Sequence, residues 1–274
     1  MLPCPDQGVA GGAAHRLNVP VTMSGRVDGI DERGAVRVAH RCFVTAVTTM
    51  LTVALSALVM MPVRAAAADV RIPLGGGAGI VINTDTLCTL TTIGSDAAGE
   101  LIGFTSAHCG GPGAQVAAEG AENAGILGTM VAGNDTLDYA VIKFDPAKVA
   151  PVANYNGFPI NGVGPDPAFG QIACKQGRTT GNSCGVTWGP GQDPGTIVMQ
   201  VCGRPGDSGG PVTVNGLLVG MIHGAFSDNL PNCIIKYIPL HTPAVVESFS
   251  AILADINAKH RSGAGFAPLP PLPA

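Results

Sequence analysis

Most of the chain after residue 68 alternates short runs of β-branched and other apolar residues with turns rich in glycine, proline and aspartate. Short apolar runs between such turns are typical of strands in antiparallel hairpins. The clearest runs, in chain order, are Gly79–Ile82, Leu87–Ile93, Leu101–Thr105, Thr196–Cys202, Val212–Val214 and Leu217–Ile222. The pattern therefore predicts an all-β fold.

One segment near the C-terminus has helical periodicity instead. Its apolar residues recur at a spacing close to that of one buried helix face. They are Val245, Val246, Phe249, Ile252, Leu253 and Ile256. We predict a C-terminal helix over 244–261 and a proline-rich tail over 262–274, in which Pro268–Ala274 is unstructured.

A proline- and glycine-rich stretch over 151–170 divides the strand-forming region. We interpret it as a connector between two domains, 69–150 and 171–243, which have similar lengths and similar strand content.

The region before residue 69 differs from the rest of the chain. Phe43–Met61 is apolar and uncharged, basic residues precede it, and Ala65–Ala68 follows it. This order is typical of a secretory signal, so residues 1–68 are predicted to be a leader that is cleaved before Asp69. The alternative is an uncleaved membrane anchor, because the segment is nearly as long as the roughly 20 residues that span a bilayer. Met23 is an alternative start of translation.

The cysteines fit a secreted protein. Of the eight, Cys4 and Cys42 lie in the leader, and the six that remain predict three disulfides in an oxidising compartment. Their spacing suggests the pairs Cys88 with Cys109, Cys174 with Cys184 across a glycine-bearing turn, and Cys202 with Cys233.

Composition and charge exclude several classes of function. The chain is 46% apolar and 12% charged, with a formal net charge of −4. No run of lysine or arginine forms the basic patch that nucleic-acid binding requires. Gly75–Gly77 is not a dinucleotide fingerprint, because Ile80 occupies the next required glycine position. The part after residue 68 is predicted to be a soluble acidic protein with no nucleic-acid partner.

The stretch Gly206–Pro211 carries the most distinctive chemistry. Ser208 follows Asp207 and precedes two glycines. Glycines allow a tight turn that presents a hydroxyl nucleophile and aims backbone N–H groups at a developing negative charge. The alternative interpretation is an ordinary surface turn, because glycine, aspartate and serine are common turn residues.

A serine nucleophile needs a base and a carboxylate that orients the base. His108 stands beside Cys109, and Asp138 leads directly into an apolar run. Taken singly, His108 is a histidine fixed beside a disulfide, and Asp138 is a turn residue. No close metal-ligand partners surround His108 in the sequence, so no metal site is predicted. Together with Ser208, the two residues form a candidate triad.

The chain from about Gly75 to Ile256 resembles the chymotrypsin-fold serine proteases, most closely their secreted bacterial branch of streptogrisins and α-lytic protease. Four segments carry the resemblance: Thr105–Cys109, Asp138–Lys143, Cys174–Gly185 and Cys202–Pro211. The resemblance implies two six-stranded antiparallel β-barrels with the active site between them, plus a C-terminal helix. It also implies a secreted, monomeric endopeptidase that cleaves peptides or proteins through an acyl-enzyme and needs no cofactor.

The resemblance also implies a role for each residue of the triad. His108 is the general base, Asp138 orients it and Ser208 is the nucleophile. The backbone N–H groups of Gly206 and Ser208 form the oxyanion hole.

The acid before the nucleophile needs a partner as well. The bacterial branch uses an internal basic residue, which here implies an ion pair between Asp207 and Lys175, with Arg178 as the alternative. Activity should then depend on Lys175.

The chain departs from its relatives at the strand that lines the substrate cleft. They have Ser-Gly-Gly there, whereas this chain has His223-Gly224-Ala225. We favour a hydrogen bond from His223 to Asp138 or to a backbone carbonyl. The alternative is that His223 binds an acidic substrate side chain. The methyl group of Ala225 predicts a narrower pocket, and Gln200, also expected at the pocket, supplies no acid for an arginine or lysine.

Two other functions fit parts of the sequence. Gly206–Gly210 also matches the G-x-S-x-G motif of α/β-hydrolase esterases, with Asp228 and His241 as partners, but too few residues follow Ser208 for that fold. The stronger alternative is a catalytically silent chymotrypsin-fold protein that binds a peptide. His223 favours it, as does a stretch before the first strand too short for the relatives' propeptide, whereas the complete triad argues against it.

Overall fold

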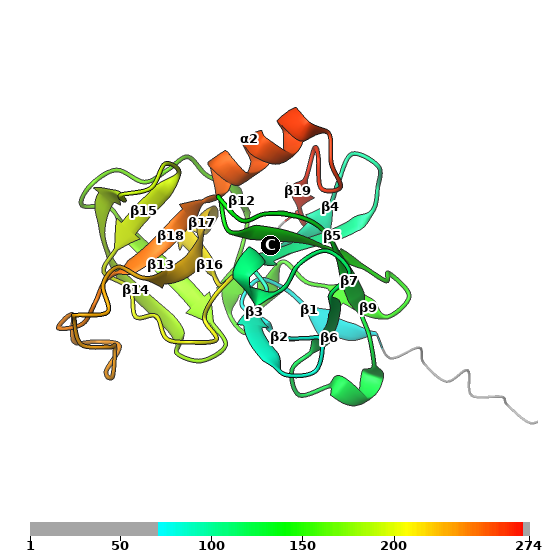
Figure 1. The fold of residues 1–274 in the computed structure, drawn as a ribbon, viewed down its shortest axis with the longest axis horizontal. Coiled ribbons are helices and arrows are strands. Elements are labelled where there is room, and N and C mark those ends of the chain that lie inside the picture. The colour runs from blue at the N-terminus through cyan, green and yellow to red at the C-terminus, as the bar shows by residue number, and fades with distance from the viewer. Residues whose placement is uncertain (1–70, 271–274) are drawn as a thin grey trace, which may run out of the picture. The chain divides into compact units, whose positions relative to one another are not determined.

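The computed structural model describes residues 71–270, which form two large β-sheets, several short strands and one α-helix (Figure 1). The predicted leader, including Phe43–Met61, lies outside the described residues. Across 71–270, no helix has the length and apolar character needed to cross a membrane. The strand content confirms the predicted all-β class.

The N-terminal sheet has eight strands in the order β19-β4-β5-β8-β7-β6-β2-β3. They are β2 (Gly79–Ile82), β3 (Thr86–Thr89), β4 (Thr92–Ser95), β5 (Leu101–Ser106), β6 (Gln115–Ala118), β7 (Gly128–Asn134), β8 (Tyr139–Phe144) and β19 (Ala267–Pro268). Short 3₁₀ turns follow β5 at Ala107–Cys109 and β6 at Glu122–Ala124.

This sheet curls back on itself at the step from β3 to β4. The N–H of Leu90 donates to Ala78 O beside β2, and the N–H of Thr91 donates to Phe104 O on β5, both at 2.8 Å. One extended run therefore pairs first with β2 and then with β5. Leu90 points into a core that also buries Ile142 and Phe144.

Short strands accompany the two large sheets. Strand β1 (Ile72–Leu74) pairs in parallel with β9 (Val149–Pro151). The predicted connector contains a small hairpin of β10 (Asn154–Tyr155) and β11 (Phe158–Pro159), and then β12 (Gly162–Val163). Strand β12 pairs in parallel with β17, so the end of the connector belongs to the second sheet.

The C-terminal sheet closes into a barrel. Its strands lie in the order β12-β17-β16-β13-β14-β15-β18, and an additional pairing of β17 with β18 joins the two sides. They are β13 (Ile172–Gly177), β14 (Gly181–Pro190), β15 (Thr196–Met199), β16 (Pro211–Val214), β17 (Leu217–Ala225) and β18 (Ala244–Ser248). These six strands form the predicted antiparallel barrel.

The predicted C-terminal helix is present but begins later than predicted. Ala244–Ser248 is strand β18, and helix α2 spans Phe249–Lys259. The barrel requires a strand here, because β18 pairs with both β15 and β17. Ser248 then caps the helix, its Oγ accepting from the N–H of Ala251 at 3.2 Å.

The prediction of an unstructured tail is wrong for the part that the structure describes. Strand β19 pairs with β4, and Pro268 itself stands opposite Gly94. Just before it, Phe266 is buried with its ring centroid 4.8 Å from that of Phe104. The segment is ordered because this aromatic contact and the ladder pairing offset the lost chain entropy.

Candidate active site

The turn that carries Ser208 leaves the C-terminal barrel just before β16 and is bound to the N-terminal sheet. Thr89 N–H donates to Ser208 O at 2.8 Å, and Thr89 Oγ1 donates to Gly206 O at 2.8 Å. Thr91 Oγ1 donates to Gly209 O at 2.6 Å. Both threonines are fully buried. The serine is therefore fixed by hydrogen bonds from the other half of the molecule.

Glycine is required immediately after the serine. Gly209 has a φ of +82°, which disfavours other residues. A Cβ here would lie 2.2 Å from Thr105 Oγ1 and 2.3 Å from Thr89 O. Because the turn packs this tightly on the end of β5, Ser208 lies against the segment that leads into His108.

The same turn presents two backbone donors. The N–H of Asp207 is used, since it donates to Arg204 O at 2.9 Å. The N–H groups of Gly206 and Ser208 have no acceptor within residues 71–270. Gly206, at a φ of +95°, provides the turn that leaves them unpaired. These are the two donors predicted for an oxyanion hole.

His108 and Asp138 are in direct contact. Asp138 Oδ2 lies 2.8 Å from His108 Nδ1, and its Oδ1 accepts from the His108 backbone N–H at 2.9 Å. Asp138 has a φ of +41°, a strained value for a residue with a side chain. Burial acts to raise the pKa of its carboxyl, but hydrogen bonds from His108 and His223 outweigh burial and hold the pKa well below its usual value.

The Ser208 hydroxyl and the His108 ring are not hydrogen-bonded to each other in the part of the chain that the structure describes. Catalytic hydrogen bonds are often long without substrate and tighten when it binds. The structure therefore brings together the aspartate–histidine half of the candidate triad and places the serine turn beside it.

Three disulfides join the predicted pairs of cysteines. They are Cys88–Cys109, Cys174–Cys184 and Cys202–Cys233. The first ties the residue after His108 to β3, the strand that also holds the serine turn. The third anchors the chain just before the serine turn.

His223 lies at Asp138 and not in a substrate pocket. Its Nδ1 is 2.6 Å from Asp138 Oδ2, the same oxygen that contacts His108. A β-bulge explains this position, because the register of β17 against β18 shifts between Ile222 and Gly224 and leaves His223 unpaired. Bulges re-aim side chains in this way beside active sites. The hydrogen bond to Asp138 raises the pKa of His223.

Glu247 is a member of this cluster that the sequence did not reveal. It is only 3% exposed, and its Oε1 lies 3.6 Å from His223 Nδ1. Its Oε2 has no hydrogen-bond partner within residues 71–270. Burial raises the pKa of its carboxyl to about 7. Glu247 was missed because its segment has helical periodicity, whereas its place on β18 is what aims it at His223.

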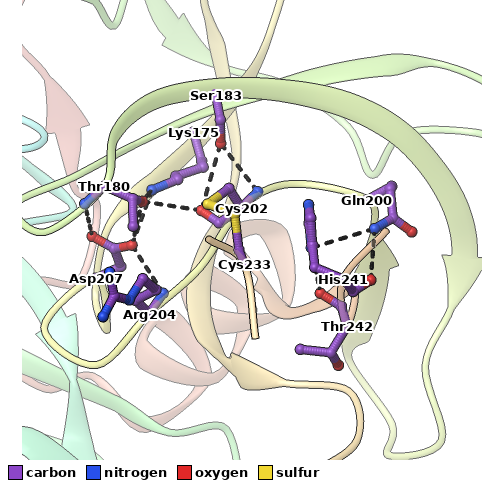
Figure 2. Close-up of a disulfide and its surroundings, with 10 residues drawn as sticks. All are labelled: Lys175, Thr180, Ser183, Gln200, Cys202, Arg204, Asp207, Cys233, His241 and Thr242. Atoms are coloured by element: carbon purple, nitrogen blue, oxygen red, sulfur yellow. Dashed lines mark hydrogen bonds and ion pairs between the residues drawn. A yellow bond between two sulfur atoms is a disulfide. The ribbon is translucent and has the colours of Figure 1, made fainter. Parts of the chain in front are cut away.

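The predicted ion pair between Lys175 and Asp207 is present (Figure 2). Lys175 Nζ lies 3.1 Å from Asp207 Oδ2, and both side chains are fully buried. Asp207 also accepts hydrogen bonds from the backbone N–H groups of Thr179 and Arg204 and from Thr180 Oγ1. The alternative partner, Arg178, pairs with Glu119 instead.

A cavity of about 310 Å³ adjoins the serine. It is lined by Ser208 and, as predicted, by Gly224 and Ala225. His223, which was also expected at the pocket, does not line it. The cavity also contains Arg204 and Asp228, which are both exposed and of opposite charge.

Gln200 is not at this cavity. It lines a larger hollow of about 970 Å³, which contains none of the candidate triad residues. Its Nε2 donates to His241 O at 3.0 Å, so its amide is already engaged (Figure 2). The residues of the esterase alternative are also separated, because Asp228 lines the smaller cavity and His241 the larger.

Comparisons with known proteins identify the fold. No protein-family model matches the chain, and no curated protein sequence matches it. Solved structures do match. A Nocardiopsis protease aligns with 22% identity and a TM-score of 0.54, over 68% of this chain and 97% of its own. A Cellulomonas bogoriensis chymotrypsin aligns with 25% identity and a TM-score of 0.52, over the same shares.

A third similar structure is a serine protease described as glutamic-acid-specific, with a histidine triad in substrate binding. It aligns with 17% identity and a TM-score of 0.55, over 72% of this chain and all of its own. The predicted fold is thus confirmed: the chain has the double-barrel fold of the bacterial chymotrypsin-like serine proteases.

Proposed function

We propose that this chain, with the fold of the bacterial chymotrypsin-like serine proteases, is a serine endopeptidase with His108, Asp138 and Ser208 as its catalytic triad. The observation that carries the proposal is the 2.8 Å contact of His108 with a buried Asp138, beside a serine turn with two N–H groups that have no acceptor within residues 71–270. The fold alone would not support it, because one fold hosts many functions.

The geometry suits acyl transfer. Asp138 accepts the Nδ1–H of His108, which leaves His108 Nε2 as the base for the Ser208 hydroxyl. The resulting alkoxide attacks the scissile carbonyl, and the N–H groups of Gly206 and Ser208 stabilise the oxyanion. His108 then protonates the leaving amine, and water hydrolyses the acyl-enzyme by the same steps in reverse.

The substrate is proposed to be a peptide whose side chain enters the 310 Å³ cavity beside Ser208. Ala225 lines this cavity, and no histidine among residues 71–270 does so. A histidine-based selection of glutamate, as described for one structural neighbour, is therefore not supported here. Three disulfides support the proposal that the protein is secreted and acts outside the cytoplasm.

A fluorophosphonate probe tests the proposal directly, because it labels only an activated serine. We expect labelling of the wild-type protein, complete loss in Ser208→Ala, and full labelling in Ser227→Ala, a control serine near the same cavity. Cleavage of a mixed peptide library should follow the same order. If folded wild-type protein is neither labelled nor active, the result contradicts the proposal and supports the peptide-binding alternative.

A further inference from the structure

Two residues of the candidate triad, His108 and Asp138, form with His223 a cluster that has the composition of a metal site. Two imidazole nitrogens and a carboxylate oxygen, from His108, His223 and Asp138, lie within 4.8 Å of one another. Two histidines and one carboxylate form a ligand set that binds Zn²⁺ and related divalent transition metals. The streptogrisins and α-lytic protease, which the sequence resembles, have serine at the position of His223, so the ligand set depends on that residue.

We infer that His108, Asp138 and His223 bind one Zn²⁺ ion, and that the bound ion reversibly switches the catalytic triad off. The inhibition rests on the proposed function, whereas the binding does not.

The geometry needs only a small adjustment to accept the ion. Asp138 Oδ2 lies 2.8 Å from His108 Nδ1 and 2.6 Å from His223 Nδ1. Ligand atoms around a tetrahedral Zn²⁺ with bonds of about 2.0–2.1 Å are about 3.3 Å apart. The side chains of His108 and His223 are 46% and 44% exposed. Rotation of the two rings can therefore lengthen the distances between the ligand atoms, and an ion can reach the rings from solvent.

The charges around the cluster also favour a divalent cation. Asp138 and Glu247 are both buried carboxylates, and Glu247 approaches His223 with one oxygen while its other oxygen lacks a partner within 71–270. A buried, unpartnered carboxylate is costly unless a positive charge compensates it. Zn²⁺ at His223 would supply that charge. Glu247 is thus expected to strengthen binding without being a direct ligand.

Metal binding and catalysis exclude each other for a chemical reason. In the active triad, His108 carries its proton on Nδ1 and uses the Nε2 lone pair as the base. Zn²⁺ takes the Nδ1 lone pairs of His108 and His223, so each neutral ring keeps its proton on Nε2 instead. A neutral ring only moves its proton from Nδ1 to Nε2, whereas a protonated His223 also releases one proton to solvent when the metal binds. In either case His108 Nε2 becomes a donor and can no longer accept the proton of Ser208.

Binding is tested by titrating Zn²⁺ into tag-free Ser208→Ala protein by isothermal calorimetry, which avoids any need for activity. We expect one ion per chain. In this background, His223→Asn keeps an N–H donor near Asp138 but removes the ligand, and should weaken affinity by more than about 100-fold, since loss of an outer-shell partner alone costs 10–100-fold. The exposed His108→Asn should do the same, whereas His260→Asn, a change at the exposed C-cap of α2, should have no effect.

Inhibition is tested separately in the wild type. Zn²⁺ should abolish peptide cleavage, a chelator should restore it, and His223→Asn should need over 100-fold more Zn²⁺ relative to its own metal-free rate. Absence of Zn²⁺ binding, or equal binding by the His223→Asn and His108→Asn variants, overturns the inference even if the protein cleaves peptides. Binding by a protein without protease activity leaves the metal site intact and removes the proposed function.

Discussion

At the scale of single residues, the site is organised by two buried carboxylates with different partners. Asp138 receives hydrogen bonds from two histidines, and Asp207 is paired with Lys175. Hydrogen-bond donors of the protein surround both carboxylates in place of water. Each therefore depends on its neighbours more than a surface acid would.

Lys175→Ala should be severely destabilising, because it leaves the buried Asp207 carboxylate without its cationic partner. The expected loss is about 3–5 kcal/mol of unfolding free energy, measured by urea denaturation, together with loss of fluorophosphonate labelling. Arg178→Ala is the matched control, since its partly exposed pair with Glu119 should contribute about 0–1 kcal/mol. Equal, small losses in the two variants would show that the buried pair is dispensable.

At the scale of elements, helix α2 holds the strand that begins next to Asp138. Asp255 on α2 accepts hydrogen bonds from the Tyr139 hydroxyl at 2.6 Å and from Asn134 Nδ2 at 3.1 Å. Lys259, one turn later on the helix, pairs with the same carboxylate. Burial and the bond to Asp255 raise the pKa of Tyr139. The helix thus fixes the residue that follows Asp138.

The stability that Asp255 provides should depend on pH. Burial acts to raise the pKa of its carboxyl, but hydrogen bonds from Lys259 and Tyr139 outweigh it and lower the pKa to about 2. A carboxyl with a lowered pKa stabilises the fold above its unfolded pKa of about 3.9 and loses this effect as the pH falls toward 2. Asp255→Asn should therefore lower Tm at pH 6, and the difference should shrink between pH 4 and pH 2.5. A constant difference across this range would contradict the assignment.

At the scale of the whole described molecule, the candidate site forms where the serine turn of the C-terminal barrel is hydrogen-bonded to the segment from β3 to β4 of the N-terminal sheet. Thr89 and Thr91 donate hydrogen bonds to three carbonyl oxygens of the serine turn, those of Gly206, Ser208 and Gly209. These bonds join segments more than a hundred residues apart in the chain. The two halves therefore cannot shift without moving Ser208.

Thr91→Val tests these hydrogen bonds between the two halves, because it keeps the shape of the side chain and leaves Gly209 O without its buried donor. We expect a loss of about 1–3 kcal/mol in unfolding free energy and a lower rate of labelling at Ser208. Thr86→Val, on the exposed part of β3, is the control and should change stability by less than about 0.5 kcal/mol. If both variants lose equally little unfolding free energy, the hydrogen bond from Thr91 does not hold the serine turn.

The sequence by itself determined the features that depend on local chemistry and on motif order. The residues of the candidate triad, the three cysteine pairs and the partner of Asp207 could all be named in advance. The cysteine pairs and the candidate triad follow from residue types and their order, whereas the partner of Asp207 and the role of each triad residue were implied by the resemblance to bacterial proteases. Gly206 and Gly209 have the positive φ values and close contacts expected of the turn around Ser208. The all-β class followed from the alternation of apolar runs and turns.

Only the tertiary structure decided which neighbours each of these residues has. The adjacent valines of β18 suit a helix or a strand, and pairing with β15 and β17 made them a strand. That choice, together with the bulge in β17, brings Glu247 and His223 to Asp138. Gln200 likewise lies away from the serine cavity, and its amide donates to His241 O, 41 residues later in the chain. Such outcomes depend on contacts between distant segments, and local periodicity carries no information about those contacts.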